Sequence, residues 1–307
     1  MCGIVAVAAR RDCTDILLEG LRRLEYRGYD SAGFALIDRE GQLSSHKTLG
    51  RVAALEAAQQ ATPLSGGTGI AHTRWATHGA PSVANAHPHV INDRIAVVHN
   101  GIIENHEVLR AALTTQGCQF VSETDTEVVA HLIALALEEG SLDVLAAVQQ
   151  VLPQLKGAYA LAVIDRESPN QLVVARQGSP LVLGIGLGEY FAGSDTLALQ
   201  SVTDTFVYLE EGDVAQLTAD GYAIFTAEGV SVDRSQNRLA LRPESEGLGD
   251  YDHYMRKEIF EQPARLRDTI EGVPPDDRMF GEHATELFSR VQAVQILACG
   301  TSYHAGL

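Results

Sequence analysis

Met1-Cys2-Gly3-Ile4-Val5 opens the sequence and is the stretch that decides both the fold and the chemistry expected of it. Initiator Met is usually removed when a small residue follows it, which would leave Cys2 as the first residue. Its thiol and a free α-amine would then sit on one residue. An α-amine has a pKa of about 7.7–8.0, so it is partly neutral at physiological pH and can act as general base for that thiol. The alternative is a buried and inert cysteine, because Cys is also a small hydrophobic residue.

Length, composition and charge limit the class of protein. A chain of 307 residues exceeds the usual size of a single core, so two domains are expected. The hydrophobic content of 45% and the charged content of 21% are typical of a globular protein. A net charge of −17 argues against nucleic acid or an anionic membrane surface as the main partner. It leaves room for a local site that binds a small anion.

The cysteines and the apolar runs bear on the compartment. The sequence has four cysteines, and their long spacings form neither a disulfide framework nor a zinc pattern: Cys2, Cys13, Cys118 and Cys299. A reducing cytoplasm fits such spacing best. The apolar run Ile4–Ala9 is too short to span a membrane, and the basic Arg10-Arg11 follows it, which is the wrong polarity for a secretory signal. We therefore expect a cytoplasmic protein without a membrane span.

The order of predicted elements indicates an α+β fold with antiparallel sheets. The run Gly3–Ala9 predicts a buried strand, and residues 158–233 read as a series of short strands separated by Gly-rich turns. Helical patterns gather between them, at residues 105–152, with a long polar loop at Arg74–Asp93 before them. Near the end, Val294–Ala298 predicts another strand.

Three short segments carry residues suited to chemistry on an amino acid. Arg74 presents a guanidinium fork that matches a carboxylate, although such an Arg also pairs with a structural Asp or Glu. Asn100-Gly101 offers an amide and a backbone N–H, which are the parts of an oxyanion hole, but Asn-Gly is equally a common turn. The acidic segment Glu123–Glu127 is also compatible with an ordinary helix N-terminus.

Five histidines between residues 72 and 99 raise the question of a metal site: His72, His78, His87, His89 and His99. No two of them have the i, i+4 spacing of a zinc-binding helix, and Pro88 interrupts the only close pair. We expect no metal and no other cofactor. The favoured interpretation is that these are polar loop histidines that hydrogen-bond the backbone.

Taken together, the motifs resemble those of the class II, N-terminal-nucleophile glutamine amidotransferases. The segments that carry the resemblance run from the first residue to the last: MCGIV at 1–5, RRLEYRGYDSAG at 22–33, GIAHTRWATHG at 69–79, NAHPH at 85–89, HNGIIENH at 99–106, SETDTE at 122–127, residues 251–263 and ILACGTS at 296–302. The resemblance implies an αββα sandwich with two stacked antiparallel sheets. It further implies a glutaminase domain at residues 2–235, a linker with connecting helices at 236–290 and the truncated start of an α/β sugar isomerase domain at 291–307.

The resemblance also assigns roles to individual residues. Cys2 would attack the side-chain amide of L-glutamine, while Asn100 and the Gly101 N–H hold the oxyanion. Arg74 would bind the substrate α-carboxylate and Asp125 its α-ammonium group. A further set completes the assignment: Thr77 and His78 in the glutamine pocket, Trp75 as the gate of an ammonia channel, and Thr301 and Ser302 in an incomplete sugar-phosphate loop.

Within the family, the chain is most similar to members that pass the ammonia to fructose 6-phosphate and make glucosamine 6-phosphate. The sequence holds no counterpart of their isomerase base or Schiff-base lysine, so the chain alone is expected to release only glutamate and ammonia. A homodimer is a candidate assembly. Three alternatives stay open: another class II amidotransferase such as amidophosphoribosyltransferase or asparagine synthetase, a non-catalytic module that binds glutamine or a phosphosugar, and a poorly folded C-terminal stub.

Overall fold

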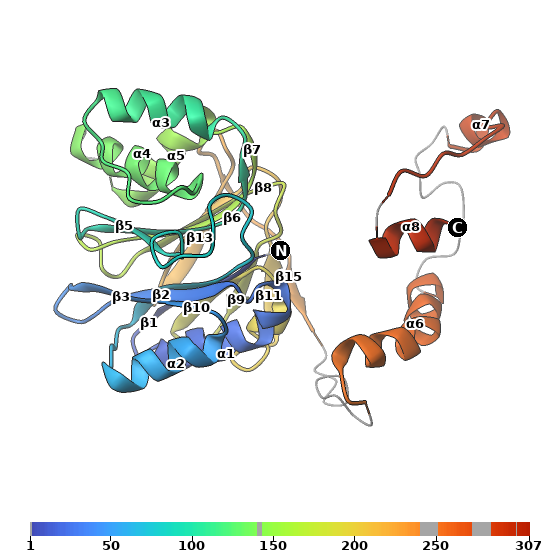
Figure 1. Cartoon of the computed structure of the whole chain (residues 1–307), viewed down its shortest axis with the longest axis horizontal. Helices are drawn as coiled ribbons and strands as arrows, with labels where there is room; N and C mark the ends of the chain where they lie inside the picture. The colour runs from blue at the N-terminus through green and yellow to red at the C-terminus, as the bar shows by residue number, and fades with distance from the viewer. Residues whose placement is uncertain (1, 140–142, 240–250, 272–283, 299) are drawn as a thin grey trace. The chain divides into compact units, whose positions relative to one another are not determined.

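The computed structural model describes residues 2–139, 143–239, 251–271, 284–298 and 300–307 of the chain (Figure 1). Two compact units are present, Met1–Leu241 and Arg242–Leu307. The strands found among the described residues all belong to the first unit. No described helix has the length and apolar character needed to cross a membrane.

Two antiparallel sheets form the centre of the first unit. The eight-stranded sheet has the order β15-β11-β9-β10-β1-β4-β2-β3, and the seven-stranded sheet has the order β14-β13-β12-β8-β7-β6-β5. The strands of the first sheet are β1 (Gly3–Ala9), β2 (Ser31–Ile37), β3 (Leu43–Leu49), β4 (Thr68–Arg74), β9 (Val182–Ile185), β10 (Glu189–Gly193), β11 (Thr205–Tyr208) and β15 (Gln236–Arg238). Those of the second are β5 (His89–Ile91), β6 (Ile95–Ile103), β7 (Gly157–Asp165), β8 (Leu172–Gln177), β12 (Val214–Thr218), β13 (Gly221–Phe225) and β14 (Ser231–Val232).

Helices cover the outer face of each sheet (Figure 1). The first sheet is covered by α1 (Thr14–Leu24) and α2 (Val52–Ala61), and the second by α3 (His106–Thr115), α4 (Thr126–Glu139) and α5 (Val144–Val151). Short 3₁₀ turns lie at Glu25–Arg27, Leu152–Gln154 and Thr196–Ala198. In α1 the apolar residues recur at helical spacing, which turns one face of the helix onto the sheet.

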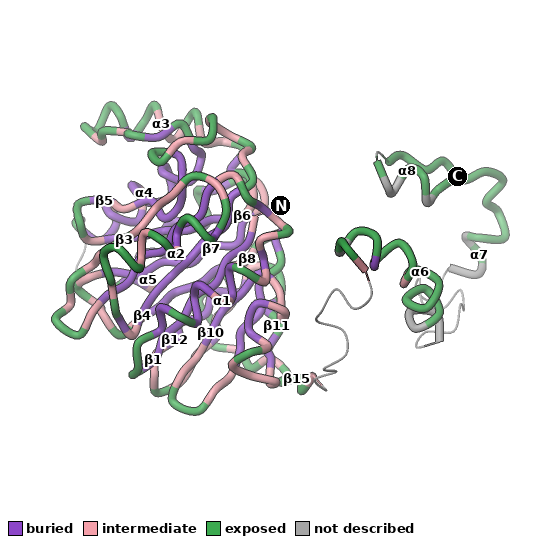
Figure 2. Tube along the Cα trace, turned by 60° about the horizontal axis from the view of Figure 1, so that its bottom comes forward, coloured by how far each residue is buried: buried purple, intermediate pink, exposed green. Residues whose placement is uncertain are grey.

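Strand β1 explains why the run Gly3–Ala9 is apolar without a break. Its even-numbered residues, such as Ile4 and Ala6, pack between the two sheets, whereas Val5 and Val7 pack under α1. Because successive side chains of a strand point to opposite faces, a strand buried on both faces must be apolar at every position. Figure 2 shows the central strands of both sheets, such as β1 and β7, buried along most of their length. The αββα fold predicted from the sequence is therefore confirmed.

Two local predictions differ from the structure of the first unit. The loop expected at residues 74–93 contains the short strand β5, which pairs with β6. Asn100-Gly101 does not form a turn after a strand but lies within β6, paired with β7. At the edge of the first sheet, β15 pairs with β11.

The second unit contains three helices among its described residues: α6 (Tyr254–Glu271), α7 (Ala284–Ser289) and α8 (Gly300–Gly306). The prediction of a strand at Val294–Ala298 is wrong, because this segment has no regular secondary structure. A strand requires a neighbour to complete its backbone hydrogen bonds, and the described part of this unit offers none. Thr301 and Ser302 lie in the first turn of α8, while Cys299 falls outside the described residues.

Candidate active site

Cys2 directly precedes β1, and the start of β1 lies beside the end of β4. Gly3 pairs with Thr73 in the antiparallel register, so Cys2 stands next to the residues that leave β4. The Trp75 backbone N–H donates a hydrogen bond to Cys2 Sγ over 3.3 Å, and the Trp75 carbonyl oxygen lies 3.6 Å from the same sulfur. Gly3 leaves no space for a larger residue, because a Cβ there would lie 2.7 Å from the Cβ of Leu24.

The protonation of this thiol follows from its surroundings. Burial raises the pKa of Cys2 above its usual value of 9.0, while the hydrogen bond from the Trp75 N–H, the charge of the N-terminus and Arg74 lower it in part. Burial dominates, because a thiolate removed from water loses its hydration. The thiol is therefore protonated at neutral pH, and nucleophilic attack requires a base beside it.

Arg74, the last residue of β4, presents unsatisfied donors inside the fold. The residue is only 3% exposed. Its Nη2 atom donates to the carbonyl oxygens of His78 and Gly79, the latter over 2.9 Å, whereas Nη1 is buried without a hydrogen-bond partner. Among the described residues Arg74 forms no ion pair, so the structural pairing left open by the sequence is not present. A buried guanidinium with free N–H groups is suited to receive a carboxylate.

Asp125 precedes α4 and lines the same site. It is 4% exposed, and its Oδ2 atom accepts a hydrogen bond from the Ile103 backbone N–H over 2.8 Å. The Nδ1 atom of His99 lies 3.9 Å from this oxygen. The carboxylate is thus fixed by the end of β6 and by the start of α4, two elements that belong to the second sheet and its cover.

Asn100 and Gly101 reach the site from β6. The Asn100 side-chain amide donates to the backbone carbonyl oxygen of Cys2 over 3.1 Å. Gly101 has a φ of 146°, in the region that favours glycine, and a Cβ there would lie 1.9 Å from the Ala158 carbonyl oxygen. Only glycine fits this position, which brings its backbone close to Cys2.

The segment that follows β4 forms the wall over Cys2. Asp30 Oδ2 accepts a hydrogen bond from the Ala76 backbone N–H over 2.7 Å, which ties this segment to the start of β2. The Trp75 ring is 43% exposed and meets the Tyr29 ring edge-on, with centroids 5.4 Å apart. The indole thus covers the site from the solvent side without entering the core.

A small cavity joins these groups. Its volume is about 20 Å³, enough for roughly one water molecule, and its lining includes both predicted and unpredicted residues. The predicted residues that line it are Cys2, Arg74, Trp75, Thr77, His78, Gly101 and Asp125; the others are His87, His99, Thr124 and Thr126. Asn100 reaches Cys2 without lining the cavity. Thr301 and Ser302 belong to the second unit and are not part of this site.

Four of the histidines form a buried cluster: His72, His87, His89 and His99. The prediction of polar loop histidines is wrong for these four, because each is at most 5% exposed. Both ring nitrogens of His72 lack a hydrogen-bond partner, whereas the other three rings contact threonine hydroxyls. Thr126 Oγ1 lies 2.8 Å from His87 Nε2 and 2.9 Å from His99 Nδ1. Thr124 Oγ1 lies 2.9 Å from His89 Nε2.

Burial holds these rings neutral. It lowers the pKa of His72 to about 3 and places the pKa values of His87 and His89 well below 6.5. The described residues contain no group of three or more His, Cys, Asp or Glu side chains arranged to hold a metal ion. The signal that could have located the cluster is the pair of threonines in the SETDTE segment, which hydrogen-bond the histidines and line the cavity together with Asp125.

Comparison with known proteins agrees with this geometry. Residues 72–201 match a family model described as a glutamine amidotransferase domain. The chain is 54% identical over 311 aligned residues to glutamine–fructose-6-phosphate aminotransferase [isomerizing] of Vibrio cholerae serotype O1, and 53% identical to that of Escherichia coli O6:H1. Each alignment covers 100% of this chain and 51% of the relative. The chain therefore spans about half the length of the curated relatives it matches.

Solved structures share the fold at lower identity. The glutamine phosphoribosylpyrophosphate amidotransferase of B. subtilis, solved with ADP and GMP, has a TM-score of 0.61 and 27% identity, covering 78% of this chain and 50% of that one. A structure described as the allosteric regulatory enzyme of purine biosynthesis has a TM-score of 0.60 and 28% identity, with the same coverage. The match to the aminotransferases is much higher in identity, which disfavours the other class II enzymes as well as a non-catalytic module. Residues 72–201 thus resemble a glutamine amidotransferase domain, and the whole chain is similar in sequence to part of the glutamine–fructose-6-phosphate aminotransferases.

Proposed function

We propose that the chain hydrolyses L-glutamine to glutamate and ammonia, with Cys2 as nucleophile and, once Met1 is removed, its own α-amine as general base. The observation that carries this proposal is the position of Cys2 Sγ in one cavity with Arg74 and Asp125. A positive and a negative side chain in the same cavity as the thiol match the carboxylate and the ammonium group of a free amino acid.

The proposed reaction proceeds through a thioester. The Cys2 thiol gives its proton to the α-amine, and the sulfur attacks the amide carbon of glutamine. The Asn100 amide and the Gly101 N–H hold the negative oxygen of the tetrahedral intermediate. The carbon–nitrogen bond then breaks, and ammonia leaves with the proton carried by the amine. Water hydrolyses the thioester, which releases glutamate and restores the thiol.

Substrate recognition rests on the groups that the fold leaves unpaired. Arg74 Nη1, buried without a partner, binds the α-carboxylate, and Asp125 binds the α-ammonium group. Thr77 and His78 line the same space. Because the cavity of about 20 Å³ is smaller than glutamine, residues 75–79 must move outward to admit it. We assign Trp75, at the solvent side of this segment, to the gate through which ammonia leaves.

In the whole protein the ammonia is passed to fructose 6-phosphate to form glucosamine 6-phosphate, a proposal supported by the names of the relatives. The domain division carried into this proposal is 2–235, 236–290 and 291–307, with Thr301 and Ser302 as part of a phosphosugar site. A homodimer, the absence of nucleic-acid and membrane partners and a location in the cytoplasm stay predictions.

Replacement of the nucleophile tests the proposal. Purified chain should lack the mass of one methionine and should release glutamate from glutamine. Cys2→Ala should lower that rate by at least about 10³-fold, whereas Cys118→Ala, a change at another free cysteine, should leave it unchanged. An equal rate in the Cys2→Ala variant, or full activity of a chain that retains Met1, would reject the mechanism.

A further inference from the structure

A second and larger cavity lies at the end of the sandwich away from Cys2. Cys2 precedes β1, whereas this cavity is lined by Arg10, Arg11 and Asp12, which follow it. Seven strand residues rise by about 3.3 Å each, so the two sites are roughly 20 Å apart. The first sheet also contributes the segments after β2 and before β4, and the second sheet contributes the β7–β8 and β12–β13 turns.

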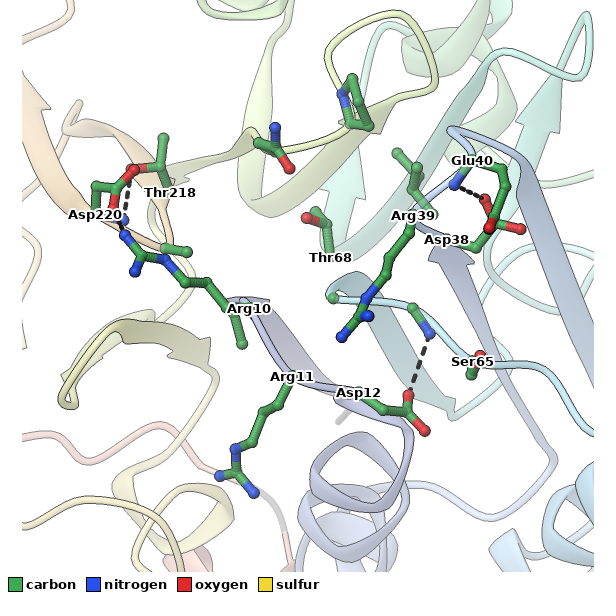
Figure 3. Close-up of a pocket in the computed structure, with 17 residues that line it drawn as sticks. Arg10, Arg11, Asp12, Asp38, Arg39, Glu40, Ser65, Thr68, Thr218 and Asp220 are labelled. Carbon is green, nitrogen blue, oxygen red and sulfur yellow. Dashed lines mark hydrogen bonds and ion pairs between the residues drawn. The ribbon is translucent and has the colours of Figure 1, made fainter.

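The size and lining of the cavity suit a small polar molecule. Its volume is about 580 Å³, within the range of known ligand pockets. Three arginines and four carboxylates line it, together with hydroxyl and amide side chains such as Thr68 and Asn170. Figure 3 shows side chains from both sheets around the same space. A lining of this kind favours a ligand that forms hydrogen bonds over an apolar one.

Most of the charged groups are already used within the protein. Arg10 pairs with Asp220, and Arg11 pairs with Glu189 through two hydrogen bonds of 2.6 and 3.0 Å. A third acidic residue, Asp12, accepts hydrogen bonds from Thr14 and from the Gly66 N–H. In the same way, Asp38 accepts from the N–H groups of its own turn. These groups build the walls and keep little capacity for a ligand.

Several lining groups remain available, and Arg39 and Thr68 are two of them. Arg39 forms no ion pair or hydrogen bond with any described residue, and Figure 3 shows its guanidinium extending across the middle of the cavity. Thr68 also lines the cavity, and its hydroxyl has no hydrogen-bond partner in the described part of the chain. A hydroxyl that no protein group uses can donate to and accept from a bound molecule.

We propose that this cavity binds a small hydroxyl-bearing anion of low charge, whose carboxylate or phosphate group pairs with Arg39 and whose hydroxyl groups bond Thr68 and Asn170. A guanidinium fork binds either anionic group through two parallel hydrogen bonds. The four carboxylates of the lining disfavour a polyanion such as a nucleoside triphosphate. The site is separate from the cavity beside Cys2 and does not depend on the proposed glutaminase reaction.

Calorimetric titration of the full chain tests the site with four probes: gluconate, glucose 6-phosphate, glucose and ATP. We expect gluconate or glucose 6-phosphate to bind with a dissociation constant below about 1 mM, and the tighter of the two identifies the anionic group. Glucose and ATP should bind at least about 10-fold more weakly, because one lacks the charge and the other carries too much.

Variants locate the binding. Arg39→Ala and Thr68→Val should each weaken the tighter probe, the first by about 10-fold or more. Arg51→Ala removes an exposed arginine outside the cavity and serves as the matched control, with unchanged affinity expected. The proposal is overturned if neither anion binds at about 10 mM, if ATP or glucose binds as tightly as the anions, or if Arg39→Ala binds like the Arg51→Ala control.

Discussion

The side-chain amide of Asn100 donates a hydrogen bond to the backbone carbonyl oxygen of Cys2 over 3.1 Å, although the two residues are 98 positions apart in the sequence. Asn100 belongs to β6 of one sheet, and Cys2 precedes β1 of the other. This bond therefore joins the two sheets at the end where the reaction is proposed to occur, and it holds the amide within reach of the nucleophile.

Loss of that amide should slow the reaction more than it weakens substrate binding. In the Asn100→Ala variant we expect kcat for glutamine hydrolysis to fall by about 10²–10³-fold, because one donor to the oxyanion is removed. KM should change little, since the oxyanion forms only in the transition state. Steady-state kinetics measure both, with Asn237→Ala, an exposed position, as control. An unchanged kcat would remove Asn100 from the mechanism.

A methyl group at position 101 should destabilise the fold. Gly101 has a φ of 146°, and an added Cβ would lie 1.9 Å from the Ala158 oxygen, so β6 and β7 would have to separate. We expect Gly101→Ala to cost about 3 kcal/mol or more in the free energy of unfolding. Gly221→Ala adds the same methyl group to a strand position with nothing within 4 Å and should have a small effect. Chemical denaturation compares the two, and equal stabilities would contradict the argument.

The geometry of the Arg74 fork should matter beyond its charge. Lysine keeps the charge but lacks the planar pair of N–H groups, so Arg74→Lys should raise KM for glutamine by about 10-fold or more. The same variant should lose most of the preference for glutamine over its α-carboxamide analogue, which has no carboxylate to bind. Competition kinetics with both substrates measure this preference. If the preference is kept in the variant, Arg74 does not bind the carboxylate.

The buried histidines should make stability depend on pH. The folded state holds the pKa of His72 at about 3, whereas an unfolded histidine titrates near 6.5. Between these values the unfolded chain binds more protons, so the free energy of unfolding decreases as pH falls from 6.5 toward 3, by at most about 1.4 kcal/mol per pH unit for each such group. Thermal melting from about pH 7 to about pH 4 should show this decrease.

A single substitution isolates the contribution of one ring. His72→Gln removes a titrating group from the cluster and should make the dependence of Tm on pH shallower. His253→Gln, at an exposed position of the second unit, should leave the slope unchanged. If Tm depends on pH equally steeply in the wild type and in His72→Gln, protonation of His72 does not cause the loss of stability.

The sequence predicted the features that depend on a local pattern of residues alone. The unbroken apolar run of Gly3–Ala9 can only be a strand buried on both faces, and β1 has those bounds. The residues near Cys2 could be selected because they recur in motifs of a known family. The distances between them and their unpaired donors could not be predicted from the sequence. Arg74 Nη1, for example, is unpaired only because of the fold that surrounds it.

The features that sequence reasoning missed depend on partners distant in the chain. Asn100-Gly101 has the local signature of a turn, but pairing with β7 extends the strand through it. The three residues of β5 are too few to show a pattern, and only β6 beside them makes them a strand. Val294–Ala298 has the pattern of a strand but no partner in the described part of its unit.

The small volume of the cavity beside Cys2 also has a consequence for the rate of turnover. With space for roughly one water molecule, the closed site excludes a five-carbon amide until the segment after β4 swings away. That swing breaks the hydrogen bond between Ala76 and Asp30, and every cycle must break and remake it. We therefore expect the opening of this segment to limit turnover, so that a more viscous solvent slows glutamine hydrolysis.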